Sequence, residues 1–333
     1  MVNFAYINPE AMNTIAIIGA GQLGSRHLQG VHKSRHTLDI HVVDSCKKSL
    51  ETARSRYDQI EPGGYHSVHF SDTIADLPDH IDIAIVATSS LPRFDVMKEL
   101  ISRKKIDTLI LEKFLFPKLW QYAKASEIIK ESGVRAFVNC PRRMYPAYDI
   151  IEHSLDRTLP VTMVKKAPDW GLCCNAIHYI DIFMRMTGQH KFEVDTRGLL
   201  PETAASKRAG YIELYGTLRI STPRGDLLEM TSTEWETENI LTIDNGSQNV
   251  EINETGGKTR INGTEHSTPV IYQSDLSGKV VDMILDGITP ELTPYEESRV
   301  YHERLFEALA GFVRRLPDSP ACVKTNDPLL PIT

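Results

Sequence analysis

The segment Gly19-Ala20-Gly21-Gln22-Leu23-Gly24 has the spacing of a turn that binds phosphate groups. It follows an apolar segment and opens a helical pattern, so the first glycine allows a tight turn and the second lets a pyrophosphate approach the backbone. The third glycine permits close packing of the helix on the strand, and the helix N-terminus attracts an anion. Asp44, 20 residues after Gly24, offers a carboxylate to ribose hydroxyls. These residues predict a dinucleotide site; the alternative is a structural turn with a surface aspartate.

The charge of Asp44 also bears on the choice of dinucleotide. A carboxylate at this position repels a 2′-phosphate, which favours NAD over NADP. Lys47 and Lys48 follow closely and would offset that repulsion. We therefore expect NAD, with NADP as the open alternative.

The elements that must position these residues alternate between strands and helices. Apolar, β-branched segments predict strands at Thr14–Gly19, Asp39–Val43, Ile81–Ala87, Thr108–Leu111 and Arg135–Val138. Helical periodicity predicts helices at Leu23–Lys33, Lys47–Tyr57, Arg93–Arg103 and Leu119–Ser132. Nearly continuous apolar strands are typical of a parallel sheet covered on both faces. We expect an α/β class with a Rossmann-type doubly wound domain over residues 1–145.

The pattern changes after Pro146. Helices are predicted at Ala147–Leu155, Cys174–Thr187, Ser274–Gly287 and Pro294–Leu316, with strands at Val161–Ala167, Tyr211–Ser221, Leu227–Glu234, Ile240–Asp244 and Asn249–Asn253. This pattern indicates an α+β domain over residues 146–333 with a large, mostly antiparallel open sheet. The proline-rich tail after Pro317 is expected to be irregular.

Composition excludes several classes of protein. The chain has 333 residues, a formal charge of −7, and 41% hydrophobic residues, which argues for two folded domains rather than disorder. The acidic balance argues against a nucleic-acid or anionic-membrane partner. Met1–Asn13 lacks the features of a signal peptide, Met12 is an alternative start, and no apolar segment approaches bilayer length. A cytoplasmic location is the default expectation.

Four regions together resemble the Gfo/Idh/MocA family of NAD(P)-dependent oxidoreductases. They are Ile15–His27, Ile83–Arg93, Leu111–Phe116 with Val138–Pro146, and Gly171–Asp181. Their order and spacing match across nearly the whole chain. The resemblance implies a nucleotide-binding domain followed by an α+β domain whose open sheet mediates a homodimer or homotetramer, with the helix 294–316 packing back towards the first domain.

The resemblance also implies site residues. Glu112-Lys113 matches the family's Glu-Lys-Pro, with Phe114 in place of the proline, so Glu112 and Lys113 are expected near the cofactor. Gly171–Asp181 matches the family's HxxD helix, which implies catalytic roles for His178 and Asp181 together with Lys113. The family's aspartate four residues before the histidine is Cys174 here, followed by Asn175, which can donate and accept hydrogen bonds but cannot act as a base.

The chemistry of an alcohol oxidation fits these residues. The nicotinamide takes a hydride, so the protein must accept the hydroxyl proton. His178 suits this task by its ordinary pKa, although alone on an apolar helix it would be interpreted as a core histidine. Lys113, at the carboxyl edge of the sheet, would accept the proton if burial lowered its pKa, or would polarise the substrate oxygen as a cation.

Other candidates have structural alternatives. Arg142 and Arg143 are expected to bind substrate, as are Asn175 and His178, but the two arginines would equally pair with acids at the domain junction. Thr88 and Ser89 are expected beside the nicotinamide ribose with Ser90 and Pro92; Ser90 would otherwise cap the next helix. The vicinal Cys173 and Cys174 rarely converge on one ion, so no metal is expected.

The sequence therefore favours an oxidoreductase that transfers a hydride between a nicotinamide and a hydroxyl or keto group. The resemblance alone implies the substrate class, a sugar, sugar nucleotide or cyclitol. Two alternatives remain: a lyase, epimerase or glycosidase that uses NAD transiently, and an inactive dinucleotide-binding regulator.

Overall fold

The alternating apolar segments of the first half form a single parallel sheet in the computed structural model, which describes residues 12–60 and 66–333. The strand order is β17-β6-β5-β4-β1-β2-β3, and only β17 is antiparallel to its neighbour. The strands are β1 (Asn13–Ile18), β2 (Leu38–Val43), β3 (Ser67–Ser71), β4 (His80–Val86), β5 (Lys105–Leu111), β6 (Arg135–Val138) and β17 (Thr293–Pro294).

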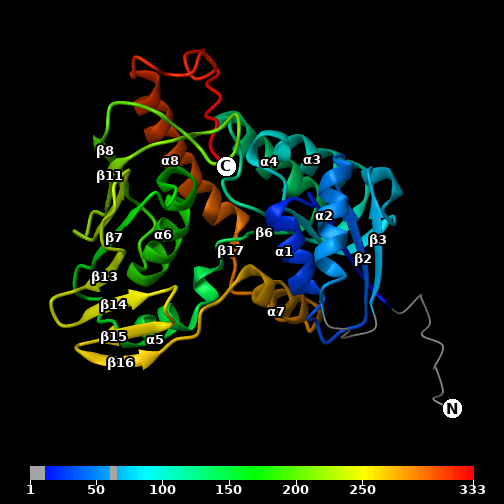
Figure 1. Ribbon diagram of the computed structural model, residues 1–333, viewed down its shortest axis with the longest axis horizontal. Helices are drawn as coiled ribbons and strands as arrows, with labels where there is room; N and C mark the ends of the chain where they lie inside the picture. The colour runs from blue at the N-terminus through cyan, green and yellow to red at the C-terminus, as the bar shows by residue number, and fades with distance from the viewer. Residues whose placement is uncertain (1–11, 61–65) are drawn as a thin grey trace.

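Helices cover both faces of this sheet (Figure 1). They are α1 (Gln22–Val31), α2 (Lys47–Tyr57), α3 (Ser90–Arg103) and α4 (Leu119–Ser132), with a 3₁₀ turn at Ile74–Asp76. Ile15 and Ile17 of β1 pack with apolar residues of α1 and α2, whereas Ile18 packs on the opposite face with those of α3 and α4. Because both faces are buried, the strands are apolar along most of their length. The doubly wound Rossmann-type fold is confirmed.

The order of the strands fixes where a ligand can bind. The chain proceeds outward from β1 through β2 to β3 on one side and through β4, β5 and β6 on the other. Loops leaving the carboxyl ends of β1 and β4 therefore diverge, and the crevice between them is the ligand site of open α/β sheets.

The second half contains a mixed sheet in the order β16-β15-β14-β13-β7-β12-β11-β8, in which only β7 and β12 are parallel. Its strands are β7 (Thr162–Pro168), β8 (Glu193–Leu199), β11 (Gly216–Ser221), β12 (Leu227–Thr233), β13 (Ile240–Asp244), β14 (Asn249–Asn253), β15 (Lys258–Ile261) and β16 (Thr264–Ser267). A separate pair joins β9 (Ala204–Ala205) to β10 (Ile212–Glu213). The predicted mostly antiparallel second sheet is confirmed.

The remaining helices connect the two halves. They are α5 (Pro146–Ser154), α6 (Leu172–Thr187), α7 (Gln273–Leu285) and α8 (Tyr295–Arg314), with a 3₁₀ turn at Pro141–Met144. α7 packs against α1, and α8 lies between α4 on one side and α6 and β8 on the other (Figure 1). Segments after residue 145 thus return to the first sheet, and the division of the chain at that residue stays a prediction.

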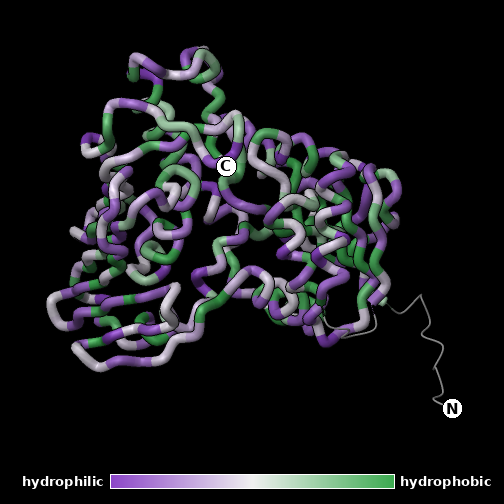
Figure 2. Tube along the Cα trace, in the orientation of Figure 1, coloured by the Kyte–Doolittle hydropathy of each residue, from purple (hydrophilic) through white to green (hydrophobic). Residues whose placement is uncertain are grey.

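Several expectations need correction. The predicted single strand Tyr211–Ser221 is wrong: β10 and β11 are separated, and Gly216 has φ +100°, which interrupts an extended run. The sequence does not predict strands β3, β8, β15 and β16, because they carry many polar residues; Figure 2 shows β15 and β16 largely in pale and purple colours. Residues 317–333 have no regular structure, as predicted.

Two findings bear on targeting. No helix within residues 12–60 and 66–333 is both long and apolar enough to cross a bilayer. The expectation that the first residues are no signal peptide falls on residues 1–11, which lie outside the described residues.

Candidate active site

The glycine turn after β1 has the geometry that its spacing predicts. Gly19 has φ +100°, and its amide donates to the carbonyl oxygen of Val43 at the end of β2 (2.7 Å). A Cβ on Gly24 would lie 1.7 Å from the carbonyl oxygen of Gly19, so only glycine lets α1 pack this closely. A Cβ on Gly21 would meet no atom within 4 Å, so the inner side of the turn is open. The N-terminus of α1 therefore faces free space, as an anion site requires.

This turn lines a first cavity, which has a volume of about 590 Å³ and lies at the carboxyl edge of the sheet. We refer to it as the cofactor cavity. The lining includes Gly19, Gly21, Gln22, Leu23, Asp44, Ser45, Asp72, Thr88, Ser89, Pro92, Lys113 and Arg208. The hydroxyl oxygen of Thr88 is buried there without a hydrogen-bond partner. An open glycine cradle and an unsatisfied hydroxyl are what a bound dinucleotide would fill and satisfy. The residues present therefore fit a dinucleotide cofactor.

Asp44 follows β2 and lines this cavity. Its Oδ2 accepts from the amide of Ala20 (2.7 Å) and its Oδ1 from that of Cys46 (2.8 Å), so the carboxylate also holds the glycine turn. A carboxylate has further acceptor capacity for ribose hydroxyls. Lys47 and Lys48 are exposed and do not line the cavity, whereas Asp72 does.

Gly21 and Gly24 give a matched pair of substitutions. Gly24→Ala is expected to cost about 1–3 kcal/mol of stability by overpacking and to abolish NAD binding. Gly21→Ala is expected to leave thermal unfolding unchanged, because its Cβ meets open space, but to weaken NAD binding by more than about tenfold. Thermal unfolding and titration calorimetry separate the two. Unchanged affinity in Gly21→Ala would place the dinucleotide elsewhere.

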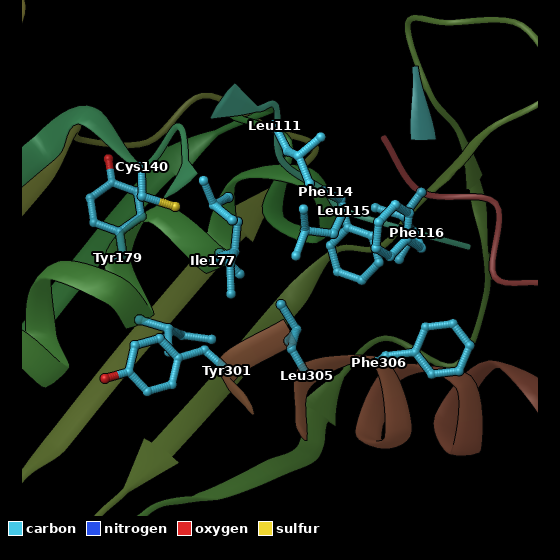
Figure 3. Packing of buried hydrophobic residues seen from close by; sticks show 14 of the residues in the cluster. Leu111, Phe114, Leu115, Phe116, Cys140, Ile177, Tyr179, Tyr301, Leu305 and Phe306 are labelled. Carbon is cyan, nitrogen blue, oxygen red and sulfur yellow. The ribbon is translucent and has the colours of Figure 1, made fainter. Parts of the chain in front are cut away.

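Lys113 is held in place by the segment that follows it. Phe114, Leu115 and Phe116 are fully buried and belong to the same core as Ile177 of α6 and Leu305 of α8 (Figure 3). The Lys113–Phe114 peptide bond is cis. Apolar packing thus anchors the backbone beside Lys113, while its side chain reaches the cofactor cavity.

From there Lys113 contacts the second half of the chain. Its Nζ donates to Oδ1 of Asn175 and to the carbonyl oxygen of Cys174, both at 3.0 Å. Asn175 in turn donates to the carbonyl oxygen of Trp170 (2.7 Å), which orients its amide oxygen towards the lysine. The amide of Asn175, and not the side chain of Cys174, therefore meets Lys113.

Asn175 also lines a second cavity, of about 1100 Å³, between α6 and the second sheet. His178 lines it as well, is 9% exposed, and has a buried Nδ1 without a hydrogen-bond partner. Burial, together with the positive charges of Lys113 and Arg142, lowers the pKa of His178 well below its usual value. The imidazole is therefore neutral near pH 7.

Two of the expected site residues instead belong to buried networks. Glu112 is 2% exposed, does not line the cofactor cavity, and binds His27 of α1 (2.8 Å) and Asn139. Burial opposes its charge, but the hydrogen bonds from His27 and Asn139 lower the pKa of Glu112. It thus joins α1 to the carboxyl edges of β5 and β6, behind the cavity.

Asp181 is fully buried, and its side chain contacts those of Arg143 and Thr293. Arg143 donates to both carboxylate oxygens (2.7 and 2.8 Å), and Thr293 of β17 donates at 2.6 Å. Arg143 also pairs with Glu297 of α8 (2.6 Å). The sequence allows Arg143 either to bind substrate or to pair with an acid at the domain junction, and the geometry favours the ion pair. Neither Arg143 nor Asp181 lines the cofactor cavity or the second, larger cavity.

Arg142, the neighbour of Arg143, lies in the second cavity and pairs with Glu254 (3.0 Å). Ser90 begins α3 and donates to the carbonyl oxygen of Ile332, so it fixes the tail and is not a cap.

The sequence did not reveal several cavity residues. Lys165, Trp170, Tyr179 and Glu254 line the second cavity, and Arg208 lines the first. Glu213 accepts from the amide of Cys173 (2.6 Å) and so supplies a carboxylate at the N-terminus of α6. Alternation in β7 would place Lys165 on the buried face with Met163, which is the one available signal.

Comparisons with known proteins agree with this geometry. Residues 13–140 match the profile of the GFO_IDH_MocA oxidoreductase family, NAD-binding Rossmann fold. An oxidoreductase from Agrobacterium radiobacter, solved with NAD⁺, L-tartaric acid and magnesium, is 12% identical with a TM-score of 0.68, over 90% of this chain and 97% of that one.

Two further solved structures are similar. Biliverdin reductase from Synechocystis, solved with biliverdin and NADP⁺, has 14% identity and a TM-score of 0.67, covering 89% and 98% of the two chains. UDP-N-acetylglucosamine 3-dehydrogenase from Acidithiobacillus ferrooxidans has 12% identity and a TM-score of 0.65, covering 89% and 96%. No curated protein matches the sequence. At these identities the structures establish the fold alone, and residues 13–140 match the Gfo/Idh/MocA family of oxidoreductases with an NAD-binding Rossmann fold.

Proposed function

We propose that the protein is an NAD-dependent dehydrogenase or reductase that acts on a hydroxyl or keto group of a sugar, sugar nucleotide or cyclitol. One observation carries this proposal: Lys113 lines the cofactor cavity and donates to Asn175, which lines the adjacent cavity beside His178. A substrate in the second cavity would therefore meet both a dinucleotide and two proton-transfer groups.

The bound dinucleotide would supply the hydride acceptor or donor. The protein must then manage one proton and one developing charge on the substrate oxygen. Lys113 donates only to neutral oxygens, so its ammonium group is free to stabilise that charge. His178 lines the second cavity and is neutral, so in this proposal it accepts the hydroxyl proton. Neither Asp181 nor Glu112 contributes directly in this proposal.

The preference for NAD rests on Asp44. We expect Asp44→Asn to weaken NAD⁺ binding by about tenfold, since a hydrogen bond to a charged acceptor contributes about 1.5–3 kcal/mol. The same change removes the repulsion of a 2′-phosphate and is expected to improve NADP⁺ binding. Calorimetry with both dinucleotides measures the ratio. A wild-type protein that prefers NADP⁺ would contradict the assignment.

Hydride transfer tests the function directly. Reduced NAD deuterated at C4 is incubated with a panel of keto-sugars, nucleotide keto-sugars and keto-cyclitols, and the products are analysed by mass spectrometry. Deuterium in a product supports the proposal. Turnover without net change in nicotinamide absorbance would favour a lyase, epimerase or glycosidase, and intact NAD binding without any transfer would favour a regulator.

The resemblance also suggests an assembly. We propose that the face of the second sheet opposite α6 joins two copies of the chain, in a homodimer or homotetramer. Residues on this face, such as Val164 and Glu229, are only half-buried in the single chain. Light scattering of the purified protein measures the mass; a monomer at micromolar concentration would contradict this proposal. A cytoplasmic location stays a prediction.

A further inference from the structure

The second cavity contains a buried ammonium group without an anionic partner. Lys165 of β7 is 5% exposed and lines the cavity beside His178. Its Nζ donates to the amide oxygen of Asn239 and makes no ion pair with any residue of 12–60 or 66–333. The ring centroids of Trp170 and Tyr179 each lie 5.9 Å from Nζ. These contacts orient the ammonium group but leave its charge uncompensated.

The charged groups nearest to Lys165 cancel one another. Glu254 accepts from Arg142 (3.0 Å), Tyr148 (2.9 Å) and Tyr179 (3.1 Å), so its carboxylate is already shared among three donors. Arg142 and Glu254 together contribute no net charge. The other charged residues that line the cavity are exposed, where water and salt screen them: Glu236, Glu238, Glu251, Lys258, Arg260 and Glu265. Of these, Glu251 pairs with Arg260 (2.7 Å) and Glu265 with Lys258 (2.9 Å), so these four contribute no net charge.

An uncompensated buried charge is costly in the free protein. Burial accordingly lowers the pKa of Lys165 to about 8. Lys165 is therefore mostly protonated at neutral pH and would gain most from a ligand that supplies a negative charge. A neutral polyol would leave the ammonium unpaired.

We propose that the second cavity recognises an acidic substrate, with a carboxylate or phosphoryl group paired to Lys165 and the reacting carbon beside His178 and Lys113. This inference rests on the proposed function for the reaction, but the anion site itself does not. It narrows the substrate class to sugar acids or phosphorylated sugars. Arg142 is no substitute for Lys165, because its guanidinium is already engaged by Glu254.

Matched ligands test the proposal by NMR saturation transfer in the presence of NAD⁺. The probes are D-glucose, D-glucuronate and D-glucose 6-phosphate, with the corresponding galactose and mannose compounds. At least one acid is expected to bind about tenfold to hundredfold more tightly than its neutral counterpart, as a charge-assisted hydrogen bond provides. The carboxylate and phosphate arms identify which anion is preferred. Equal binding of acid and neutral members, or binding of no acid, would overturn the proposal.

Substitution of Lys165 tests whether its charge serves to bind an acidic ligand or to stabilise the fold. Lys165→Met is expected to remove the preference for the acid while binding of the neutral sugar and NAD⁺ stays within about threefold. It should also raise the thermal unfolding temperature, because an unpaired buried charge is replaced by an apolar side chain and the exposed Asn239 can bind water. If Lys165 served only to stabilise the fold, Lys165→Met would instead lower the unfolding temperature.

The pH dependence provides an independent measurement. The titratable groups nearest to Lys165 are Glu254, Arg142 and Tyr179, and His178 lines the same cavity. The exposed rim of the cavity adds Glu236, Glu238, Glu251, Lys258, Arg260 and Glu265. Hydrogen bonds and charge keep Glu254 and Arg142 ionised, burial keeps Tyr179 neutral, and His178 is neutral near pH 7. Affinity for the acid is therefore expected to fall as pH rises through about 8 in the wild type, but not in Lys165→Arg. A flat wild-type profile would contradict the proposal.

The outcomes distinguish this inference from the proposed function. Hydride transfer to neutral substrates without dependence on Lys165 leaves the function standing and removes the anion site. If an acid binds in a manner that depends on Lys165 but no substrate receives a hydride, the anion site stands and the proposed function fails.

Discussion

Lys113→Met is expected to lower kcat for hydride transfer by about 10²–10³-fold, the effect of removing one group that stabilises a developing oxyanion. Methionine has a similar length and no charge, so it keeps the packing beside the cavity while the hydrogen bonds to Asn175 and Cys174 are lost. NAD affinity is expected to change by no more than about threefold, because in the proposed binding mode the glycine turn and Asp44 would hold the dinucleotide. Stopped-flow kinetics and calorimetry measure the two quantities.

Asn175→Ala is the matched control for this prediction. It removes one of the two acceptors of Lys113 but leaves the lysine and the carbonyl oxygen of Cys174 in place. We expect a smaller loss of about tenfold in kcat, since the lysine is less well positioned but still charged. If Lys113→Met retained full biological activity, the protein would be a dinucleotide-binding regulator and the dehydrogenase assignment would fail.

Asp181→Asn is expected to destabilise the protein by about 3 kcal/mol, because it leaves Arg143 buried with only the half-buried Glu297 as counter-charge. The resemblance implies a catalytic role for Asp181, whereas the geometry indicates an ion pair that joins α6, β17 and the turn after β6. The folded variant is therefore expected to keep its kcat. Urea unfolding and kinetics at low temperature measure stability and activity separately.

A double-substitution cycle checks the cause of that loss. Arg143→Met leaves Asp181 buried without its partner and should cost a similar amount, while the double variant should cost less than the sum of the two. Additive losses would mean that the pair is not the source of the stability. A fall of more than about tenfold in kcat without loss of stability would return Asp181 to the catalytic site.

Local sequence signals determined the first domain because its features are local. The spacing of Gly19, Gly21 and Gly24 specifies one turn, and β6, α2 and α4 have the predicted bounds, since each is delimited by its own apolar pattern or caps. Edge strands such as β3 and β16 escaped prediction because a strand exposed on one side needs few apolar residues.

The sequence alone thus determined the Rossmann-type fold and predicted a dinucleotide site, and with the family resemblance it predicted Lys113 and His178 as the groups with suitable chemistry. Only the tertiary structure decided which polar residues face a ligand. Arg142 and Arg143 are adjacent in the chain, yet one lies in the second cavity and the other in a buried ion pair. His178 and Asp181 share a helix and separate in the same way. The physical reason is that burial and pairing depend on neighbours supplied by distant segments, such as Glu254 and Thr293, and local spacing carries no information about them.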